Sequence, residues 1–93
     1  MTAAELLKSI DEAACIDFLA GMIRHKSYTQ TDGERRLVEY MCKAMRDIGL
    51  DAAMTPVEAD RFNAIGTWKG QGGGKSLLFN GHLDTNPVTE GWT

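Results

Sequence analysis

The chain has 93 residues, of which 43% are hydrophobic and 25% are charged, and its formal net charge is −3. These values are typical of one small soluble domain, and a net negative charge gives no electrostatic basis for binding nucleic acid or an anionic membrane. The sequence has no long apolar stretch and no leader-like start, so it predicts neither a membrane span nor a secretory signal, and the cytoplasm is the expected location.

The first part of the chain predicts helices. Residues 2–8 form a short helical lead-in, and a longer helix begins near Ser9, where Ser9-x-x-Glu12 matches a capping box. Apolar residues then recur at helical spacing and predict one apolar stripe: Cys15, Ile16, Phe18, Leu19, Met22 and Ile23. With two helices and three strands, at least one helix face and one sheet edge are expected to lack cover. His25 falls in the last turn, where a cation suits the helix dipole, so we interpret it as a surface cap rather than a metal ligand.

A further helix is predicted after a polar connection. Thr31-x-x-Glu34 matches a second capping box, and Gly49 is the expected stop. One face of this helix carries the apolar residues Leu37, Tyr40, Met41, Ala44, Met45 and Ile48, with Val38 at its flank. Cys15 and Cys42 both lie in helical patterns and are interpreted as buried free thiols.

The second half of the chain predicts strands. Residues 51–57 form a strand with Pro56 near its end, which suggests an edge position, and residues 63–68 form a second strand. Residues 70–74 form a glycine-rich loop, and residues 76–82 form a third strand. The continuous apolar run 77–79 is typical of a strand that is buried on both faces. The expected fold is therefore α/β, with two helices followed by about three strands.

The glycine loop resembles the end of a phosphate-binding loop, because Gly72-Gly73-Gly74 precedes Lys75-Ser76. The full motif requires a glycine where the chain has Lys69, and it also requires a helix after the loop, whereas a strand is expected here. Nucleotide binding is therefore a minor alternative, and a hairpin connection explains the glycines.

The sequence Gly81-His82-Leu83-Asp84-Thr85 lies at the carboxyl end of the third predicted strand. In extended geometry, residues i and i+2 point to the same side, so His82 and Asp84 are expected to be neighbours. A carboxylate beside an imidazole can accept its N–H and leave the other nitrogen for a metal. From these residues alone, a purely structural His–Asp hydrogen bond and a metal site both remain open, because zinc requires three or four ligands.

The run from Leu78 to Pro87, followed by Gly91-Trp92, closely resembles the first metal-site motif of a co-catalytic zinc metallopeptidase family. This family includes acetylornithine deacetylase, succinyl-diaminopimelate desuccinylase, aminoacylase and glutamate carboxypeptidase. The resemblance implies that His82 is a metal ligand and that Asp84 is the catalytic-site carboxylate that orients it. One departure is Asn86, which stands where the family commonly has valine and which affects the pocket wall more than the metal.

The resemblance also implies an activity. Members of the family use two zinc ions, sometimes cobalt, with a glutamate as general base, to hydrolyse amide bonds of N-acyl amino acids or peptides. The chain would be an incomplete amino-terminal piece, residues 1–93, of the catalytic domain of a metal-dependent amidohydrolase. The second domain, which serves as lid or dimerisation unit, would lie outside it, and the parent could be a homodimer.

Two consequences are expected from the resemblance. The remaining ligands and the base would lie beyond Thr93, so the piece by itself is expected to be inactive. The alternative is a non-catalytic binding or scaffold domain that retains the fold, and downstream acidic residues would discriminate between the two.

Overall fold

The computed structural model of the chain describes residues 1–89 and 91. It contains the helices α1 (Ala3–Lys8), α2 (Glu12–Ile23) and α3 (Asp32–Asp47), followed by the strands β1 (Asp51–Glu58) and β2 (Arg61–Thr67). The α/β class is confirmed. Among the described residues no helix is long and apolar enough to cross a bilayer.

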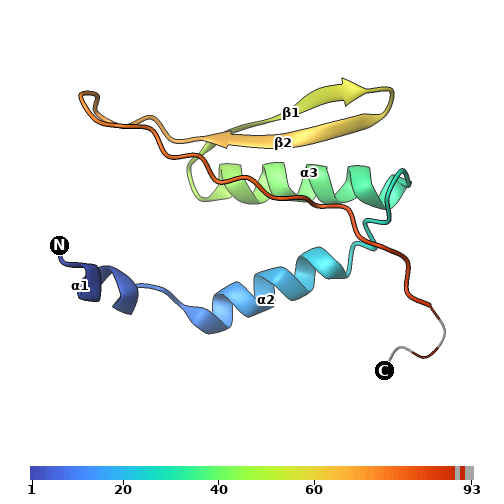
Figure 1. Cartoon of the computed structure of the whole chain (residues 1–93), viewed down its shortest axis with the longest axis horizontal. Helices are drawn as coiled ribbons and strands as arrows, with labels where there is room; N and C mark the ends of the chain where they lie inside the picture. The colour runs from blue at the N-terminus through green and yellow to red at the C-terminus, as the bar shows by residue number, and fades with distance from the viewer. Residues whose placement is uncertain (90, 92–93) are drawn as a thin grey trace.

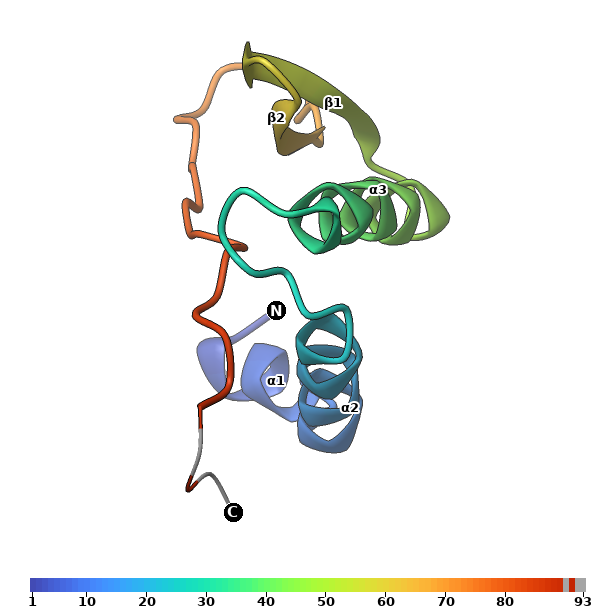
Figure 2. The same ribbon diagram turned by 90° about the vertical axis from the view of Figure 1, so that its right-hand side faces the viewer.

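The elements are arranged in three layers (Figure 1). The β1–β2 hairpin lies on one side of α3, and α1 and α2 lie on the other side, while the chain after β2 runs down one flank of the stack (Figure 2). The two strands pair antiparallel, from Asp51 opposite Thr67 to Pro56 opposite Phe62, with an irregularity between Pro56 and Glu58. The strands at 51–57 and 63–68 and the position of Pro56 near the end are thus confirmed.

The hydrophobic core lies between α3 and the hairpin. Its buried side chains are Leu37, Val38, Cys42 and Ala52. Val38 is part of this core rather than at its flank, whereas Ile48 is exposed because α3 has already ended. Gly49 has a φ of 97°, and the amides of Gly49 and Leu50 donate back to the carbonyls of Arg46 and Met45, each at 3.0 Å. This geometry is a Schellman stop, as the glycine predicted.

The helix starts differ from the predicted capping boxes. Thr2 and Glu5 form a reciprocal box at the start of α1, but Ser9 lies at the end of that helix. The side chain of Asp11 caps α2 instead, by accepting from the Ala14 amide at 3.0 Å, because it stands next to the first helical residue. Thr31 does precede α3, but its side chain makes no cap hydrogen bond.

The apolar stripe of α2 is largely uncovered. Ile16 and Ile23 are each 61% exposed, and Cys15 is exposed as well, whereas Cys42 is buried as predicted. The contact of α2 with α3 is made around Tyr40, whose ring stacks on Phe18 at a centroid distance of 5.7 Å. A Cβ added at Gly21 would lie 3.0 Å from the Tyr40 hydroxyl, so this glycine allows the two helices to approach closely.

The third predicted strand is not present in this structure. Residues 76–84 are extended but outside the sheet, and Leu77, Leu78 and Phe79 are 79%, 86% and 86% exposed. A continuous apolar run becomes a central strand only when a ladder partner and two covering layers are available. The described part of the chain supplies neither beside these residues.

The molecule exposes more surface than a compact chain of its size. Its accessible area is 8141 Å² for a mass of 10.2 kDa, whereas a compact monomer of that mass exposes about 5,300 Å². Its radius of gyration is 16.0 Å, against about 12 Å for a compact domain of this length. The hairpin and α3 are packed, but α1, α2 and the carboxyl-terminal segment remain open to solvent.

Candidate metal centre

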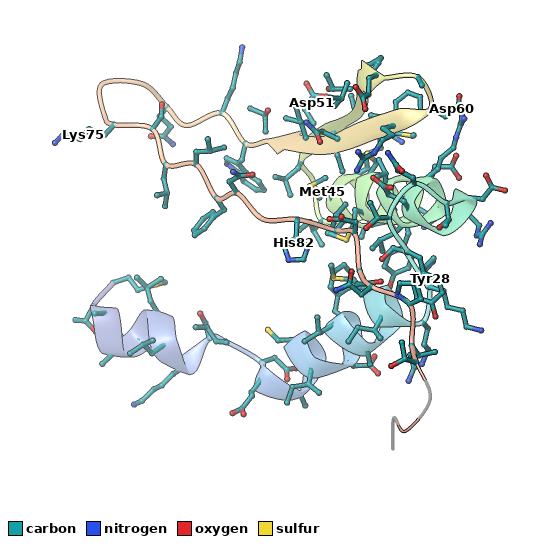
Figure 3. The ribbon with its side chains drawn as sticks, turned by 45° about the vertical axis from the view of Figure 1, so that its right-hand side comes forward. Tyr28, Met45, Asp51, Asp60, Lys75 and His82 are labelled. Atoms are coloured by element: carbon teal, nitrogen blue, oxygen red, sulfur yellow. The ribbon has the colours of Figure 1, made fainter. Side chains whose placement is uncertain are left out.

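His82 and Asp84 lie on the extended segment that follows the glycine loop and passes α3 (Figure 3). As predicted, their side chains lie on the same side. Nδ1 of His82 is 3.3 Å from Oδ1 of Asp84 and 2.9 Å from the Asp84 carbonyl oxygen. Since both neighbours are acceptors, Nδ1 carries the proton, and Nε2 of the neutral ring keeps its lone pair.

The two side chains differ in exposure. The His82 side chain is 82% exposed, whereas that of Asp84 is 36% exposed. The imidazole is therefore not enclosed by aliphatic groups, and its free nitrogen is accessible to a ligand. A purely structural histidine is commonly buried and hydrogen-bonded on both nitrogens, which is not the environment of His82.

Asp84 also contacts a residue from a distant part of the chain. The Thr29 hydroxyl donates to Oδ2 of Asp84 at 2.9 Å. This hydrogen bond is the main reason that the pKa of the Asp84 carboxyl lies below its usual value. Desolvation opposes the shift and His82 adds to it, so the carboxylate is ionised and able to accept the imidazole N–H.

The donor set fits one part of a metal centre. An imidazole with a free Nε2, oriented through Nδ1 by a carboxylate, has the form of a zinc-ligating histidine. No group of three or more His, Cys, Asp or Glu side chains in residues 1–89 and 91 is arranged to hold a metal. These residues can therefore contribute one ligand, and a four-coordinate centre requires others.

The remaining sequence motifs do not form a second site. His25 caps α2 as predicted, with Nδ1 at 2.8 Å from the Gly21 carbonyl oxygen, and its ring packs on Tyr40 rather than standing free at the surface. The glycine loop is open, and an extended segment rather than a helix follows Lys75, which is not the geometry of a phosphate-binding loop. Glu90, Trp92 and Thr93, and with them the Trp92 half of the Gly-Trp element, lie outside the described residues.

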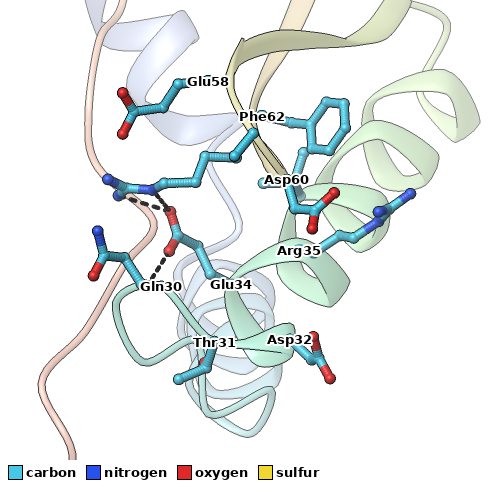
Figure 4. A pocket seen from close by; sticks show the side chains of 11 residues that line it. Gln30, Thr31, Asp32, Glu34, Arg35, Glu58, Asp60 and Phe62 are labelled. Carbon is cyan, nitrogen blue, oxygen red and sulfur yellow. Dashed lines mark hydrogen bonds and ion pairs between the residues drawn. The ribbon is translucent and has the colours of Figure 1, made fainter.

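A separate cleft of about 320 Å³ lies between the start of α3 and the hairpin turn (Figure 4). Arg61 donates two hydrogen bonds to Oε1 of Glu34, from Nε at 3.1 Å and from Nη2 at 3.0 Å. The backbone N–H of Gln30 donates to the other carboxylate oxygen, Oε2, at 2.6 Å. Glu34 thus ties α3 to β2 instead of completing the capping box predicted for it. The cleft is a structural junction, and neither His82 nor Asp84 lines it.

Sequence reasoning missed Ser27 and Thr29, which contact the segment around Asp84 from the connection between α2 and α3. Their partners lie more than fifty positions further along the chain. No spacing rule joins residues at that separation, and serine and threonine are ordinary in a polar connection.

Comparison with known proteins gives a limited similarity. The chain is 30% identical over 82 residues to a protein named acetylornithine deacetylase from Vibrio atlanticus (strain LGP32), which covers 82% of this chain and 21% of that protein. The chain therefore spans about a fifth of the length of this relative. No family model matches the chain, and no solved structure matches it. The similarity supports, at this broad level, a relationship with the deacetylase and peptidase family that the His82 motif resembles.

Proposed function

We propose that this chain is the amino-terminal part of a metal-dependent hydrolase that cleaves amide bonds of N-acyl amino acids or peptides. The observation that carries the proposal is the His82–Asp84 pair, in which Nδ1 lies 2.9 Å from the Asp84 carbonyl oxygen and 3.3 Å from its carboxylate, on a His82 side chain that is 82% exposed. The similarity to a protein named acetylornithine deacetylase supports the reaction class and suggests an N-acetylated amino acid as the first substrate to assay.

In this proposal His82 ligates a zinc or cobalt ion through Nε2, and Asp84 fixes the tautomer and orientation of the ring. The metal, when bound, would supply Lewis-acid polarisation and activation of water. The chain's own contribution is to hold a neutral imidazole with its proton on Nδ1, because only that form offers Nε2 to a cation. A second zinc ion, the other ligands and the general base would come from further parts of the parent protein.

The large exposed surface of the chain supports the proposal that further parts of a parent protein pack against it. The accessible area exceeds that of a compact monomer by more than about 2,500 Å². The apolar run 77–79 and the stripe of α2 are the surfaces that further parts of the parent would cover. Location in the cytoplasm and assembly into a homodimer stay predictions.

The metal role can be tested on the chain itself. Zinc is titrated into the purified chain while the ring nitrogens of both histidines are followed by ¹⁵N NMR. We expect the Nε2 resonance of His82 to shift while His25, whose Nδ1 is bonded to the Gly21 carbonyl and whose ring packs on Tyr40, does not respond. His82→Ala should abolish the response and His25→Ala should preserve it. A zinc response at His25 instead of His82, or one that survives His82→Ala, contradicts the proposal.

The catalytic part requires the parent protein. The chain with zinc alone should not hydrolyse an N-acetylated amino acid, because one imidazole cannot replace a complete ligand set. The parent protein should hydrolyse it only with zinc or cobalt, and His82→Ala should lower kcat/KM by more than about a hundredfold, since even residues that only orient a ligand cost 10–100-fold. A parent that retains the fold without activity would point to the binding or scaffold alternative, and a parent that is active without metal would contradict the metal role of His82.

A further inference from the structure

The connection between α2 and α3 is hydrogen-bonded to the segment that carries the candidate metal ligand. The buried Ser27 accepts from the Thr85 amide at 2.8 Å through its carbonyl, and its hydroxyl donates to the Leu83 carbonyl at 2.8 Å. The Thr29 amide donates to the Thr85 carbonyl at 3.2 Å. Together these bonds make Tyr28 and Thr85 partners in an isolated parallel bridge.

This bridge stands out because the rest of the segment has no comparable support. The Ser27 residue is 1% exposed, whereas Leu78 and Phe79, only a few residues before His82, are 86% exposed. The backbone on the carboxyl side of His82 is thus held in place, and the backbone on its amino side is open to solvent. Orientation of the His82 ring must therefore come from residues 83–85 and their partners.

The hydroxyl of Thr29 acts on the carboxylate itself. It donates to Oδ2 of Asp84 at 2.9 Å, while Oδ1 of the same group faces Nδ1 of His82 at 3.3 Å. A carboxylate that is held on one oxygen cannot rotate freely about its last bond, so the other oxygen keeps its position relative to the imidazole. Thr29 is the only one of the three residues that lies outside the predicted motif.

We propose that Thr29 is a positioning residue for the metal ligand His82, acting through Asp84, with Ser27 as the backbone anchor. This inference rests on the proposed function, because it assigns Thr29 a part in presenting Nε2 to a metal. The contacts connect Thr29 to Asp84 and Asp84 to His82: the Thr29 O–H donates to Oδ2, and Nδ1 of His82 donates to the Asp84 carbonyl oxygen at 2.9 Å with Oδ1 3.3 Å away. Loss of the Thr29 hydroxyl should therefore free the carboxylate beside Nδ1 and weaken the preference of His82 for the Nδ1–H tautomer, which the Asp84 carbonyl also supports.

The variant that isolates this hydroxyl is Thr29→Val. Valine has the same shape as threonine, and the hydrogen bond from the Thr29 backbone N–H to the Thr85 carbonyl stays in place. Because residue 29 is also exposed to solvent, the fold should persist. The ¹⁵N spectrum of the ring reports the tautomer directly, without any metal. We expect the unaltered chain to show His82 with its proton on Nδ1, and Thr29→Val to populate the Nε2–H form and to raise the zinc dissociation constant about tenfold.

Two controls separate positioning from a general structural effect. Thr29→Ser should restore both the tautomer and the zinc affinity, because serine retains the hydroxyl. Thr31→Val removes a hydroxyl from the same connection that donates to the Tyr28 carbonyl and not to Asp84, so it should leave His82 unchanged.

The outcomes are distinct. If Thr29→Val keeps the tautomer and zinc affinity of the unaltered chain, or if Thr31→Val changes them equally, the positioning role is overturned. If the zinc response of the unaltered chain survives His82→Ala, the proposed metal function fails instead, whatever the tautomer.

Discussion

The α3–hairpin unit and the carboxyl-terminal segment show opposite relations between sequence pattern and environment. Leu37 on α3 is 2% exposed and packs in the layer beneath the hairpin, whereas Leu78, in an even more apolar run, is 86% exposed. Leu37 has covering partners nearby in the chain, since a turn and a hairpin bring β1 and β2 back onto α3. Leu78 would need partners from elsewhere. Apolar residues therefore predict burial only where the chain also supplies the cover.

A second difference is functional. The packed unit contains the core but none of the candidate metal-site residues, whereas the open segment carries His82 and Asp84 and is tied down only around residues 83–85. The core and the candidate site thus lie in different parts of the chain, and matched substitutions in the two parts can test the comparison.

The largest effect is expected for Leu37→Ala compared with Leu78→Ala. Removing a buried leucine side chain should lower the free energy of unfolding by about 2–5 kcal/mol, whereas the exposed leucine should change it by no more than about 0.5 kcal/mol. Urea denaturation followed by circular dichroism measures both. Equal effects of the two substitutions would mean that residues 77–79 are covered in solution, and the contrast between the two regions would be lost.

A smaller effect is expected at the junction between the connection and α3. A Cβ added at Gly33 would clash with the Lys26 carbonyl oxygen, which is backbone and cannot move aside, whereas a Cβ at Gly74 meets nothing within 4 Å. Gly33→Ala should therefore destabilise the chain by about 1–3 kcal/mol. Gly74→Ala is the control and should be close to neutral. The same denaturation measurement applies, and a neutral Gly33→Ala would show that the close approach is not maintained.

The anchor of the open segment should respond to Ser27→Ala. This change removes the hydroxyl bond to the Leu83 carbonyl, a contribution of about 1 kcal/mol. This hydrogen bond stabilises the position of residues 83–85 and not the core. The amide hydrogen of Thr85 should therefore exchange with solvent several-fold faster, while the amide hydrogens of α3 are unaffected. Ser76→Ala, at an exposed position of the same segment, should leave the exchange of Thr85 unchanged. Uniformly faster exchange in α3 would indicate that the two regions unfold together.

The smallest effect concerns pH. The pKa of Asp84 is lowered in the folded chain, so the folded state binds this proton more weakly than the unfolded state does. The resulting stabilisation is complete above the ordinary carboxyl pKa of about 3.9 and is lost as the pH falls through the lower folded value. Thr29→Val should move the Asp84 pKa upward, because it removes the main cause of the shift. A ¹³C titration of the carboxyl group measures this, and an unchanged pKa would contradict the assignment of that cause.

The sequence by itself determined the local features. Helical spacing predicted α3, Gly49 predicted its stop, Pro56 suggested an edge position for β1, and the i, i+2 spacing predicted that His82 and Asp84 share a side. Each of these follows from steric or hydrogen-bonding preferences within a few residues, and such preferences act in any surroundings.

Only the tertiary structure decided which apolar residues find cover and what holds the candidate site. The run 77–79 lies outside any strand and is exposed, contrary to the prediction, and the stripe of α2 is open, because burial depends on layers that local pattern does not specify. The hydrogen bonds of Ser27 and Thr29 to residues 83–85 form because the fold brings together two segments that are more than fifty positions apart in the sequence. This proximity is fixed by the packing of whole elements, so the residues that orient Asp84 could be identified only once the fold was known.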